Sequence, residues 1–142
     1  MKAKDLMTAE PCCCSPDDSL SEVASMMRDA DCGSVPVIEA GRVIGIVTDR
    51  DLAVRGLARG LSGETKVRDV MTASPECCSE NADVHEIERL MSDRQVRRVP
   101  IVNADGGCVG IVSQADLARA SSHSGALAKE VAETVAEISA PN

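Results

Sequence analysis

The chain has 142 residues, with 15 Lys or Arg and 23 Asp or Glu, so its formal charge is −8 at pH 7, and it contains no Phe, Tyr or Trp. Nucleic-acid-binding proteins present basic surfaces and often aromatic rings for base stacking, so this composition argues against a nucleic-acid polymer as a partner. With 44% hydrophobic and 27% charged residues, the chain is expected to fold as one ordinary domain or as two small units sharing a core.

The sequence shows no targeting or membrane segment. Its opening stretch, MKAKDLMTAE, lacks the apolar run of a signal peptide, and nowhere do the roughly 18 consecutive apolar residues of a membrane span occur. A cytoplasmic protein with no membrane partner is therefore expected. The seven cysteines are too few for a disulfide scaffold, so reduced thiols are the plain expectation.

The chain repeats itself. Residues 5–9 (DLMTA) match residues 69–73 (DVMTA), and residues 45–53 (GIVTDRDLA) match residues 110–118 (GIVSQADLA). Two copies of one supersecondary unit explain this match. The copies are expected to occur together, because neither alone would bury its apolar face well. The expected divisions are a first repeat over residues 1–60, a second over residues 61–121, and a C-terminal segment over residues 122–142.

Each copy is predicted to open with a short strand and an amphipathic helix. Apolar residues recur at helical spacing over residues 20–27, after the capping candidate Asp17, and over residues 84–91, after Asn81.

A β-hairpin is predicted next in each copy, from two β-rich runs that flank a glycine turn. The runs are residues 35–38 and 43–47 in the first copy, and residues 99–102 and 109–112 in the second. The second run of each hairpin continues directly into a predicted helix, which starts at Thr48 in the first copy and at Ser113 in the second. The fold class is therefore α/β, with two tandem β-α-β-β-α units.

Two further segments complete the chain. Residues 56–66, GLARGLSGETK, are rich in glycine and polar residues and are predicted to link the copies. Ser124 is a capping candidate for a last helix, which has a narrow apolar stripe from Leu127 to Ile138. That stripe needs a partner, so the helix packs either on its own domain or on a second chain in a homodimer.

The most informative feature is a motif that begins in the second strand of each hairpin. It consists of a glycine, two apolar residues, a Ser or Thr and, three residues later, an Asp. It runs from Gly45 through Thr48 to Asp51, and again from Gly110 through Ser113 to Asp116. Ser/Thr-x-x-Asp is by itself a capping box. Because it occurs twice after a strand whose glycine permits close approach, we favour a second role, in which the hydroxyl binds phosphate and the carboxylate binds two ribose hydroxyls.

In combination, M-T-x-x-P, V-P-[VI] and G-I-V-[ST]-x-x-D in both copies resemble a tandem pair of CBS domains, also called a Bateman module, over about residues 4–121. The layout is similar to that of small standalone bacterial CBS-pair proteins. The resemblance implies two α/β repeats packed through their sheets with pseudo-twofold symmetry, and adenine nucleotides bound in the clefts between the repeats. It also implies that a separate effector protein reads the bound state.

The resemblance assigns roles to individual residues. Thr48 and Asp51 would contact phosphate and ribose at a first site, and Ser113 and Asp116 would do so at a second. The positions that would edge the adenine are Cys12, Cys13, Val35 and Pro36 in the first copy, and Cys77, Val99 and Pro100 in the second.

Cations are expected to distinguish the two sites. The resemblance implies that Arg97 and Arg98 contribute to the first site. The alternative is that both are solvent-exposed residues at the start of a strand, with no role in binding. The matching positions in the first copy are Gly33 and Ser34, so the second site would lack these cations and take Arg50 instead. Since a guanidinium forms charge-assisted hydrogen bonds with phosphate, tighter binding is expected at the first site.

AMP, ADP, ATP, NAD and S-adenosylmethionine all fit as regulatory ligands, and no metal is required. The sequence has no Ser/His/Asp arrangement, metal-ligand cluster or phosphate-binding G-x-x-x-x-G-K-[ST] loop, so we do not expect an enzyme. His85 is expected to be a solvated surface residue.

Two other functions stay open. The adjacent cysteines at equivalent places in the two copies permit a thiol- or zinc-dependent redox or stress sensor, although small buried hydrophobic residues are their plainer interpretation. The other function is a structural dimerisation module with empty sites.

Overall fold

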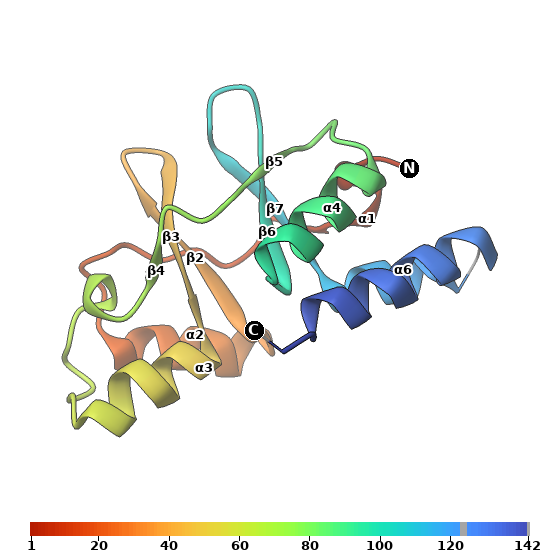
Figure 1. Ribbon diagram of the computed structural model, residues 1–142. Coiled ribbons are helices and arrows are strands. Elements are labelled where there is room, and N and C mark those ends of the chain that lie inside the picture. The colour runs from red at the N-terminus through yellow and green to blue at the C-terminus, as the bar shows by residue number, and fades with distance from the viewer. Residues whose placement is uncertain (123–124, 142) are drawn as a thin grey trace. The chain divides into compact units, whose positions relative to one another are not determined.

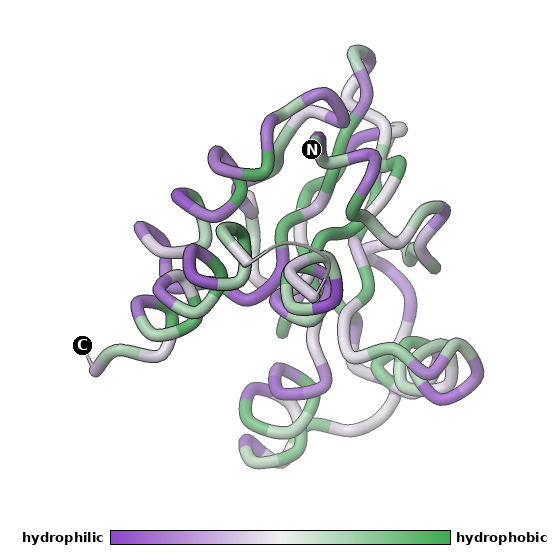
Figure 2. The backbone as a smooth tube through the Cα atoms, turned by 90° about the vertical axis from the view of Figure 1, so that its right-hand side faces the viewer, coloured by the Kyte–Doolittle hydropathy of each residue, from purple (hydrophilic) through white to green (hydrophobic). Residues whose placement is uncertain are grey.

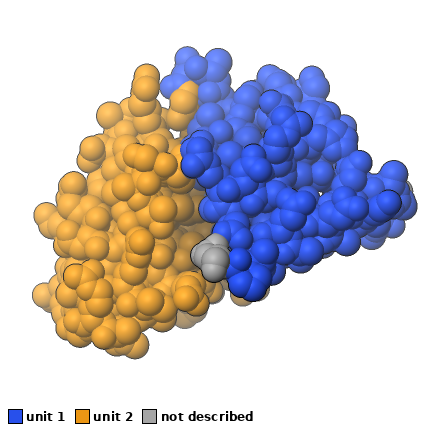
Figure 3. Space-filling view, in the orientation of Figure 1, with its two compact units in different colours: residues 1–10, 76–105, 109–142 blue, residues 11–75, 106–108 orange. Residues whose placement is uncertain are grey.

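The computed structural model describes residues 1–122 and 125–141 of the chain. They form two compact units, each with its own sheet and its own hydrophobic core (Figure 1, Figure 3). Unit 1 contains Met1–Glu10, Glu76–Asp105 and Val109–Asn142, and unit 2 contains Pro11–Pro75 and Gly106–Cys108.

The elements confirm the predicted α/β class and the C-terminal helix. In chain order they are α1 (Ala3–Leu6), β1 (Thr8–Ala9), α2 (Leu20–Ala30), β2 (Ser34–Glu39), β3 (Arg42–Thr48), α3 (Asp49–Asp51), the π-helix η1 (Leu52–Gly56), the 3₁₀-helices η2 (Leu57–Arg59) and η3 (Val67–Asp69), β4 (Thr72–Ala73), β5 (Cys78–Ser79), α4 (Val84–Arg94), β6 (Arg98–Val102), β7 (Cys108–Ser113), α5 (Gln114–Ser121) and α6 (Gly125–Ile138).

Unit 2 is built around the predicted hairpin of β2 and β3. The two strands are antiparallel, with Ser34 opposite Thr48 and Glu39 opposite Arg42. Ala40 and Gly41 have φ of 51° and 76°, as a two-residue type I′ turn requires. The short strand β4 pairs antiparallel with β3, so the sheet has the order β2-β3-β4.

The core of unit 2 consists mostly of valines, because the hairpin turns its β-branched residues inward and α2 lays its apolar face on them. Its buried members are Cys14, Leu20, Val23, Met27, Val35, Val37, Val47, Val67 and Val70.

The helices α2 and α4 begin at Leu20 and Val84, where the predicted apolar spacing begins, but both predicted capping residues are wrong. Ser19 caps α2 and accepts a hydrogen bond from the amide of the third helical residue at 3.1 Å. Asp17 instead accepts a hydrogen bond from Arg68 Nη2 at 2.7 Å, which lowers the pKa of the Asp17 carboxyl. In the second copy Asp83, rather than Asn81, caps α4.

The segment predicted as a linker, residues 56–66, is bound to the start of α2. The carbonyl oxygens of Gly63 and Thr65 accept hydrogen bonds from the first two amides of that helix, both at 3.0 Å. The first amides of a helix have no partner within the helix. The segment therefore stabilises α2 as well as connecting the two copies.

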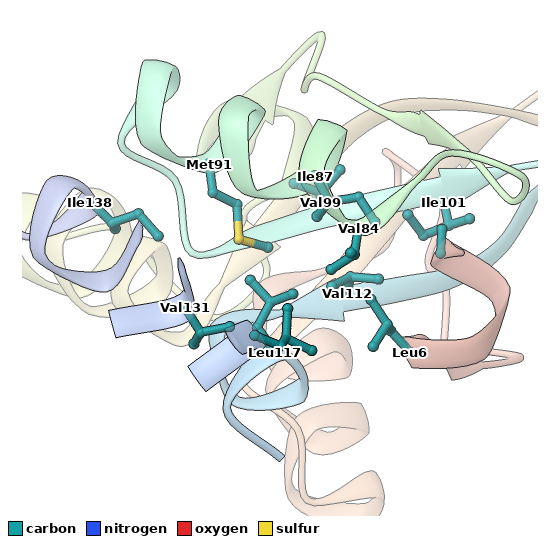
Figure 4. Packing of buried hydrophobic residues seen from close by; sticks show 12 residues of the cluster. Leu6, Val84, Ile87, Met91, Val99, Ile101, Val112, Leu117, Val131 and Ile138 are labelled. Carbon is teal, nitrogen blue, oxygen red and sulfur yellow. The ribbon is translucent and has the colours of Figure 1, made fainter. Parts of the chain in front are cut away.

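Unit 1 contains a four-stranded sheet in the order β1-β7-β6-β5. β1 is antiparallel to β7, with Thr8 opposite Ile111, and β5 is parallel to β6, with Cys78 opposite Ile101. Side chains from this sheet and from α1, α4, α5 and α6 make the core (Figure 4). Its buried members are Ala3, Leu6, Val84, Ile87, Met91, Val99, Ile101, Val112, Leu117, Leu127, Val131 and Ile138.

The C-terminal helix α6 packs on α4 and α5 of its own unit. In Figure 4, Val131 points toward Leu117 and Ile138 points toward Met91. Hydrophobic and hydrophilic residues alternate along the helix in Figure 2, as an amphipathic helix requires. Of the two predicted partners for the apolar stripe, its own domain is the one observed; the capping candidate Ser124 lies outside the described residues.

The opening segment of each sequence copy joins the sheet of the other copy. β1 starts the first copy and pairs with β7 in unit 1, whereas β4 starts the second copy and pairs with β3 in unit 2. The amide of Ala3 also donates to the carbonyl oxygen of Ala82 at 2.8 Å. The compact units therefore differ from the sequence repeats by an exchange of these segments.

Candidate functional site

The first motif forms a capping box between β3 and α3. The Oγ1 atom of Thr48 accepts a hydrogen bond from the Asp51 amide at 3.1 Å, and Asp51 Oδ2 accepts one from the Thr48 amide at 3.0 Å. The second carboxylate oxygen, Oδ1, forms an ion pair with Arg55 Nε at 3.9 Å, a separation too long for a hydrogen bond. Among the described residues the Thr48 hydroxyl proton has no acceptor. One Asp51 oxygen and one Thr48 proton thus remain available to a ligand.

Arg55 is held beside this motif by the backbone of the β4 region. Its Nη1 atom donates to the carbonyl oxygens of Met71 at 3.2 Å and Val70 at 3.4 Å. It lies in η1, and π-helical turns are frequent at functional sites. Arg55 was not predicted from the sequence, although its i,i+4 spacing from Asp51 is the signal that indicates it.

The second motif forms the same capping box, but both oxygens of its carboxylate already have partners. Asp116 Oδ2 accepts hydrogen bonds from the Ser113 amide at 2.8 Å and from the Ser113 hydroxyl at 3.0 Å. Its Oδ1 atom pairs with Arg119 Nη2, and Asp116 is only 5% exposed. Both carboxylate oxygens and the hydroxyl proton are therefore occupied. Arg119 was also missed from the sequence, and its i,i+3 spacing from Asp116 indicates it.

The residues before β2 and β6 lie next to the motif of their own unit. The carbonyl oxygen of Gly33 accepts a hydrogen bond from the Asp49 amide at 3.0 Å, and that of Arg97 accepts one from the Gln114 amide at 2.8 Å. Gly33 and Arg97 thus occupy equivalent positions, as the match between the copies predicts. Within unit 1, Arg97 lies beside the Ser113 motif.

Several predicted contacts involve residues from different units. The assignments of Arg97 and Arg98 to the Thr48 motif, and of Arg50 to the Ser113 motif, stay predictions. In the hairpins, the side chains of Val35 and Val99 are fully buried in the cores of their own units. The side chains of these two residues are therefore not available to a ligand.

The cysteines of the first copy become more buried along the chain. Cys12 is exposed, Cys13 is partly buried, and Cys14 is buried beside β2, where its amide donates to the Pro36 carbonyl oxygen at 2.9 Å. Burial, with a smaller contribution from the Asp18 carboxylate, raises the pKa of the Cys14 thiol to about 12. Cys14 fits the interpretation as a small buried hydrophobic residue.

The cysteines of the second copy border a surface pocket of unit 1. The pocket has a volume of about 350 Å³, and its lining residues are Cys77, Cys78, Ser79, Asn81, Ala82 and Glu86. Burial raises the pKa of the Cys78 thiol, and nearby carboxylates add to this effect.

Cys14 is expected to be the slower of Cys12 and Cys14 to react with iodoacetamide in the folded protein. With a pKa of about 12, roughly one Cys14 in ten thousand is a thiolate at pH 8, and the thiolate is the nucleophile. Mass spectrometry of peptides from an alkylation time course measures both rates. In urea the two rates should converge; equal rates in the folded protein would contradict the buried position of Cys14.

Two segments of the chain, residues 3–56 and 67–123, match the family model of the CBS domain. The chain belongs to the CBS-domain family. The CBS domain-containing protein YhcV of Bacillus subtilis is 39% identical over 115 residues, which are 81% of each protein. The crystal structure of Hypoxic Response Protein I with two coordinated zinc ions is 35% identical, with a TM-score of 0.75 over 84% of this chain and 98% of that chain.

A third relative is CBSX2, whose crystal structure is in complex with AMP. It is 26% identical, with a TM-score of 0.72 over 86% of this chain and 96% of that chain. These matches confirm the CBS-pair resemblance that the two motifs indicate. The zinc ions of Hypoxic Response Protein I show that the expectation of a metal-free CBS pair does not hold for every relative. No helix in the described part of this CBS pair is long and apolar enough to cross a membrane.

Proposed function

We propose that this CBS pair is a non-catalytic regulatory module that binds an adenine nucleotide through Thr48 and Asp51 and signals the bound state to a separate partner protein. One observation carries the proposal: Asp51 Oδ1 forms an ion pair with Arg55 Nε at 3.9 Å but accepts no hydrogen bond, and it lies beside a Thr48 hydroxyl whose proton has no acceptor among the described residues. The AMP bound to CBSX2 supports this class of ligand.

The two free groups suit the two polar parts of a nucleotide. The Thr48 hydroxyl would donate to a phosphate oxygen, and Asp51 Oδ1 would accept hydrogen bonds from the ribose hydroxyls. Asp51 Oδ2 would keep its bond to the Thr48 amide, so binding leaves the capping box intact. The ligand therefore adds hydrogen bonds without breaking any that hold the motif.

The adenine is proposed to contact the backbone of residues 12–13 and 34–36. These segments are joined, because the Cys14 amide donates to the Pro36 carbonyl oxygen at 2.9 Å and the Ile38 amide donates to the Cys14 carbonyl oxygen at 2.8 Å. With no Phe, Tyr or Trp in the chain, the base cannot stack on any of these rings. Reversible binding of moderate affinity is the expected consequence.

A second, weaker site is proposed at Ser113 and Asp116, with the backbone of Cys77, Val99 and Pro100. It is weaker because the Asp116 carboxylate is already occupied by Ser113 and Arg119. The cations proposed for the nucleotide phosphates are Arg50, Arg97 and Arg98. Titrating AMP into single Gln variants of each would assign them to one motif or the other.

A thermal-shift panel tests the ligand class. AMP, ADP, ATP, NAD and S-adenosylmethionine should be compared with GMP, a control nucleotide that differs from AMP only in its base. A ligand that binds only the folded state at about 100 times its Kd adds about 2.7 kcal/mol to the free energy of unfolding. We expect at least one adenine ligand to raise the melting temperature and GMP to leave it unchanged. A panel in which nothing shifts, or in which GMP shifts equally, would overturn the proposal.

A thiol- or zinc-dependent stress sensor is the second candidate function, supported by the two zinc ions of Hypoxic Response Protein I. The Cys108 side chain is hydrogen-bonded to Cys13 and raises the pKa of the Cys13 thiol, so two sulfur atoms lie close together. Counting reactive thiols and bound zinc in protein purified without reductant separates this candidate from the nucleotide sensor.

A further inference from the structure

Three side chains of the metal-ligating kind meet where α6 packs on α4. His85 and Glu88 are three residues apart on α4, so they share one face of that helix, and Glu130 comes from α6. One imidazole nitrogen and one oxygen of each carboxylate all lie within 4.8 Å of one another. The sequence could not indicate this cluster, because Glu130 is far from the other two residues along the chain.

The distances match the coordination sphere of a small divalent cation. His85 Nδ1 is 3.0 Å from Glu130 Oε2 and 3.6 Å from Glu88 Oε2. Ligands that sit about 2.0–2.1 Å from a tetrahedral zinc ion are separated from one another by about 3.3 Å. The two observed separations lie on either side of that value, and both involve the same nitrogen atom.

Each carboxylate of the cluster has one buried oxygen that takes part in no hydrogen bond among the described residues. The Glu88 side chain is only 9% exposed, and its Oε1 atom is buried without a hydrogen-bond partner among the described residues, as is Glu130 Oε2. Burial, with a contribution from the Glu130 charge, raises the pKa of the Glu88 carboxyl. Burying a carboxylate without a partner is costly, and a bound cation removes that cost.

The second nitrogen of the imidazole ring also has a suitable neighbour. His85 Nε2 is 3.9 Å from Oδ1 of Asp83, the residue that caps α4. When one ring nitrogen of a histidine binds a metal, the other carries the proton and commonly faces a carboxylate, which fixes the ring. His85 Nδ1 is then the nitrogen that faces the two glutamates.

We propose that His85, Glu88 and Glu130 bind one divalent transition-metal ion, for which Zn²⁺ is the best match, and that this ion fastens α6 to α4. One nitrogen and two oxygen ligands are a donor set that zinc accepts. The side chains of His85 and Glu130 are 57% and 42% exposed, so the cluster is open to solvent and a water molecule completes the coordination. This site uses none of the residues proposed to bind the nucleotide.

Zinc titration of metal-free protein by isothermal calorimetry tests the site, after the accessible thiols are alkylated so that they do not compete. Glu88→Gln and Glu130→Gln are each expected to lower the Zn²⁺ affinity by about tenfold or more. Glu133→Gln, an exposed position on the same helix, is the matched control and should bind like the wild type. Failure of the wild type to bind zinc, or binding unchanged in Glu88→Gln and Glu130→Gln, would overturn the proposal.

Unfolding of the same alkylated, metal-free proteins gives a second readout. Zn²⁺ should raise the denaturant midpoint of the wild type and of Glu133→Gln but not that of Glu88→Gln. In metal-free protein Glu88→Gln should be at least as stable as the wild type, because it removes an unpartnered buried charge. Equal stabilisation of all three proteins by zinc would place the ion elsewhere and overturn the assignment.

Discussion

Asp51→Asn is expected to weaken AMP binding by about 10- to 150-fold, and Asp116→Asn is expected to weaken it less. A hydrogen bond to a charged group contributes about 1.5–3 kcal/mol, which corresponds to that range of affinity. Asp51 has an oxygen without a hydrogen bond, 3.9 Å from Arg55 Nε, whereas both oxygens of Asp116 are already bonded to Ser113 and Arg119. Only Asp51 can therefore offer a charged acceptor to the ribose without losing a hydrogen bond.

Isothermal calorimetry with AMP measures the effect of both substitutions. Asparagine retains a carbonyl oxygen that can accept the bond from the Thr48 amide, so the capping box and the fold should survive. A melting curve of each ligand-free variant checks this point. Arg119→Gln is a further variant: it frees Asp116 Oδ1 and should strengthen binding at the second motif. Equal losses for Asp51→Asn and Asp116→Asn, or no loss for either, would contradict the assigned roles.

Elements that depend on neighbouring residues were predicted well from the sequence. The hairpin turn at Ala40 and Gly41 and the helix starts at Thr48 and Ser113 were correct, because turn and capping chemistry acts over three or four residues. The capping residue Asp17 was wrong because Ser19 is a second candidate two positions later. Sequence alone does not show that Arg68, 51 residues away, binds Asp17.

Features that depend on distant pairing were not predictable in this way. Nothing in the repeat indicates that β1 and β4 are exchanged between the sheets of the two copies. Residues 56–66 have the composition of a linker, yet their carbonyl oxygens bind the amides of α2. Composition reports which residues tolerate an irregular backbone, and it does not report which distant amides that backbone satisfies.

The candidate site shows the same division between local and distant information. Thr48, Asp51, Ser113 and Asp116 were found because both motifs are contiguous. The difference between them was attributed to cations before the hairpin strands, whereas within each unit the visible difference is the pairing of Asp116 with Arg119. Helical spacing permits an arginine–aspartate pair in both motifs. Whether the pair closes to a hydrogen bond depends on side-chain conformation, and it does so only at Asp116.

Val131→Asp is expected to lower the free energy of unfolding by about 3–5 kcal/mol, the typical cost of an unpaired buried charge. Val131 is 4% exposed and lies in the unit 1 core beside Leu117, so the new carboxylate would be buried away from water. Ala132→Asp, on the exposed side of the same helix, is the control and should change stability little.

Urea unfolding at two protein concentrations distinguishes the two partners that the apolar stripe of α6 could have had. If α6 stabilises its own unit, the loss caused by Val131→Asp is the same at both concentrations, because the contact is within one chain. If the stripe were instead a contact between two chains, the loss would grow with the concentration of the wild-type reference, because dimer stability depends on protein concentration. Hydrogen exchange should show the largest loss of protection in α6 and in the residues of α4 and α5 that it covers. An effect as small as that of Ala132→Asp would mean that α6 contributes little to the core, and that the packing of Val131 on Leu117 does not hold the helix in place.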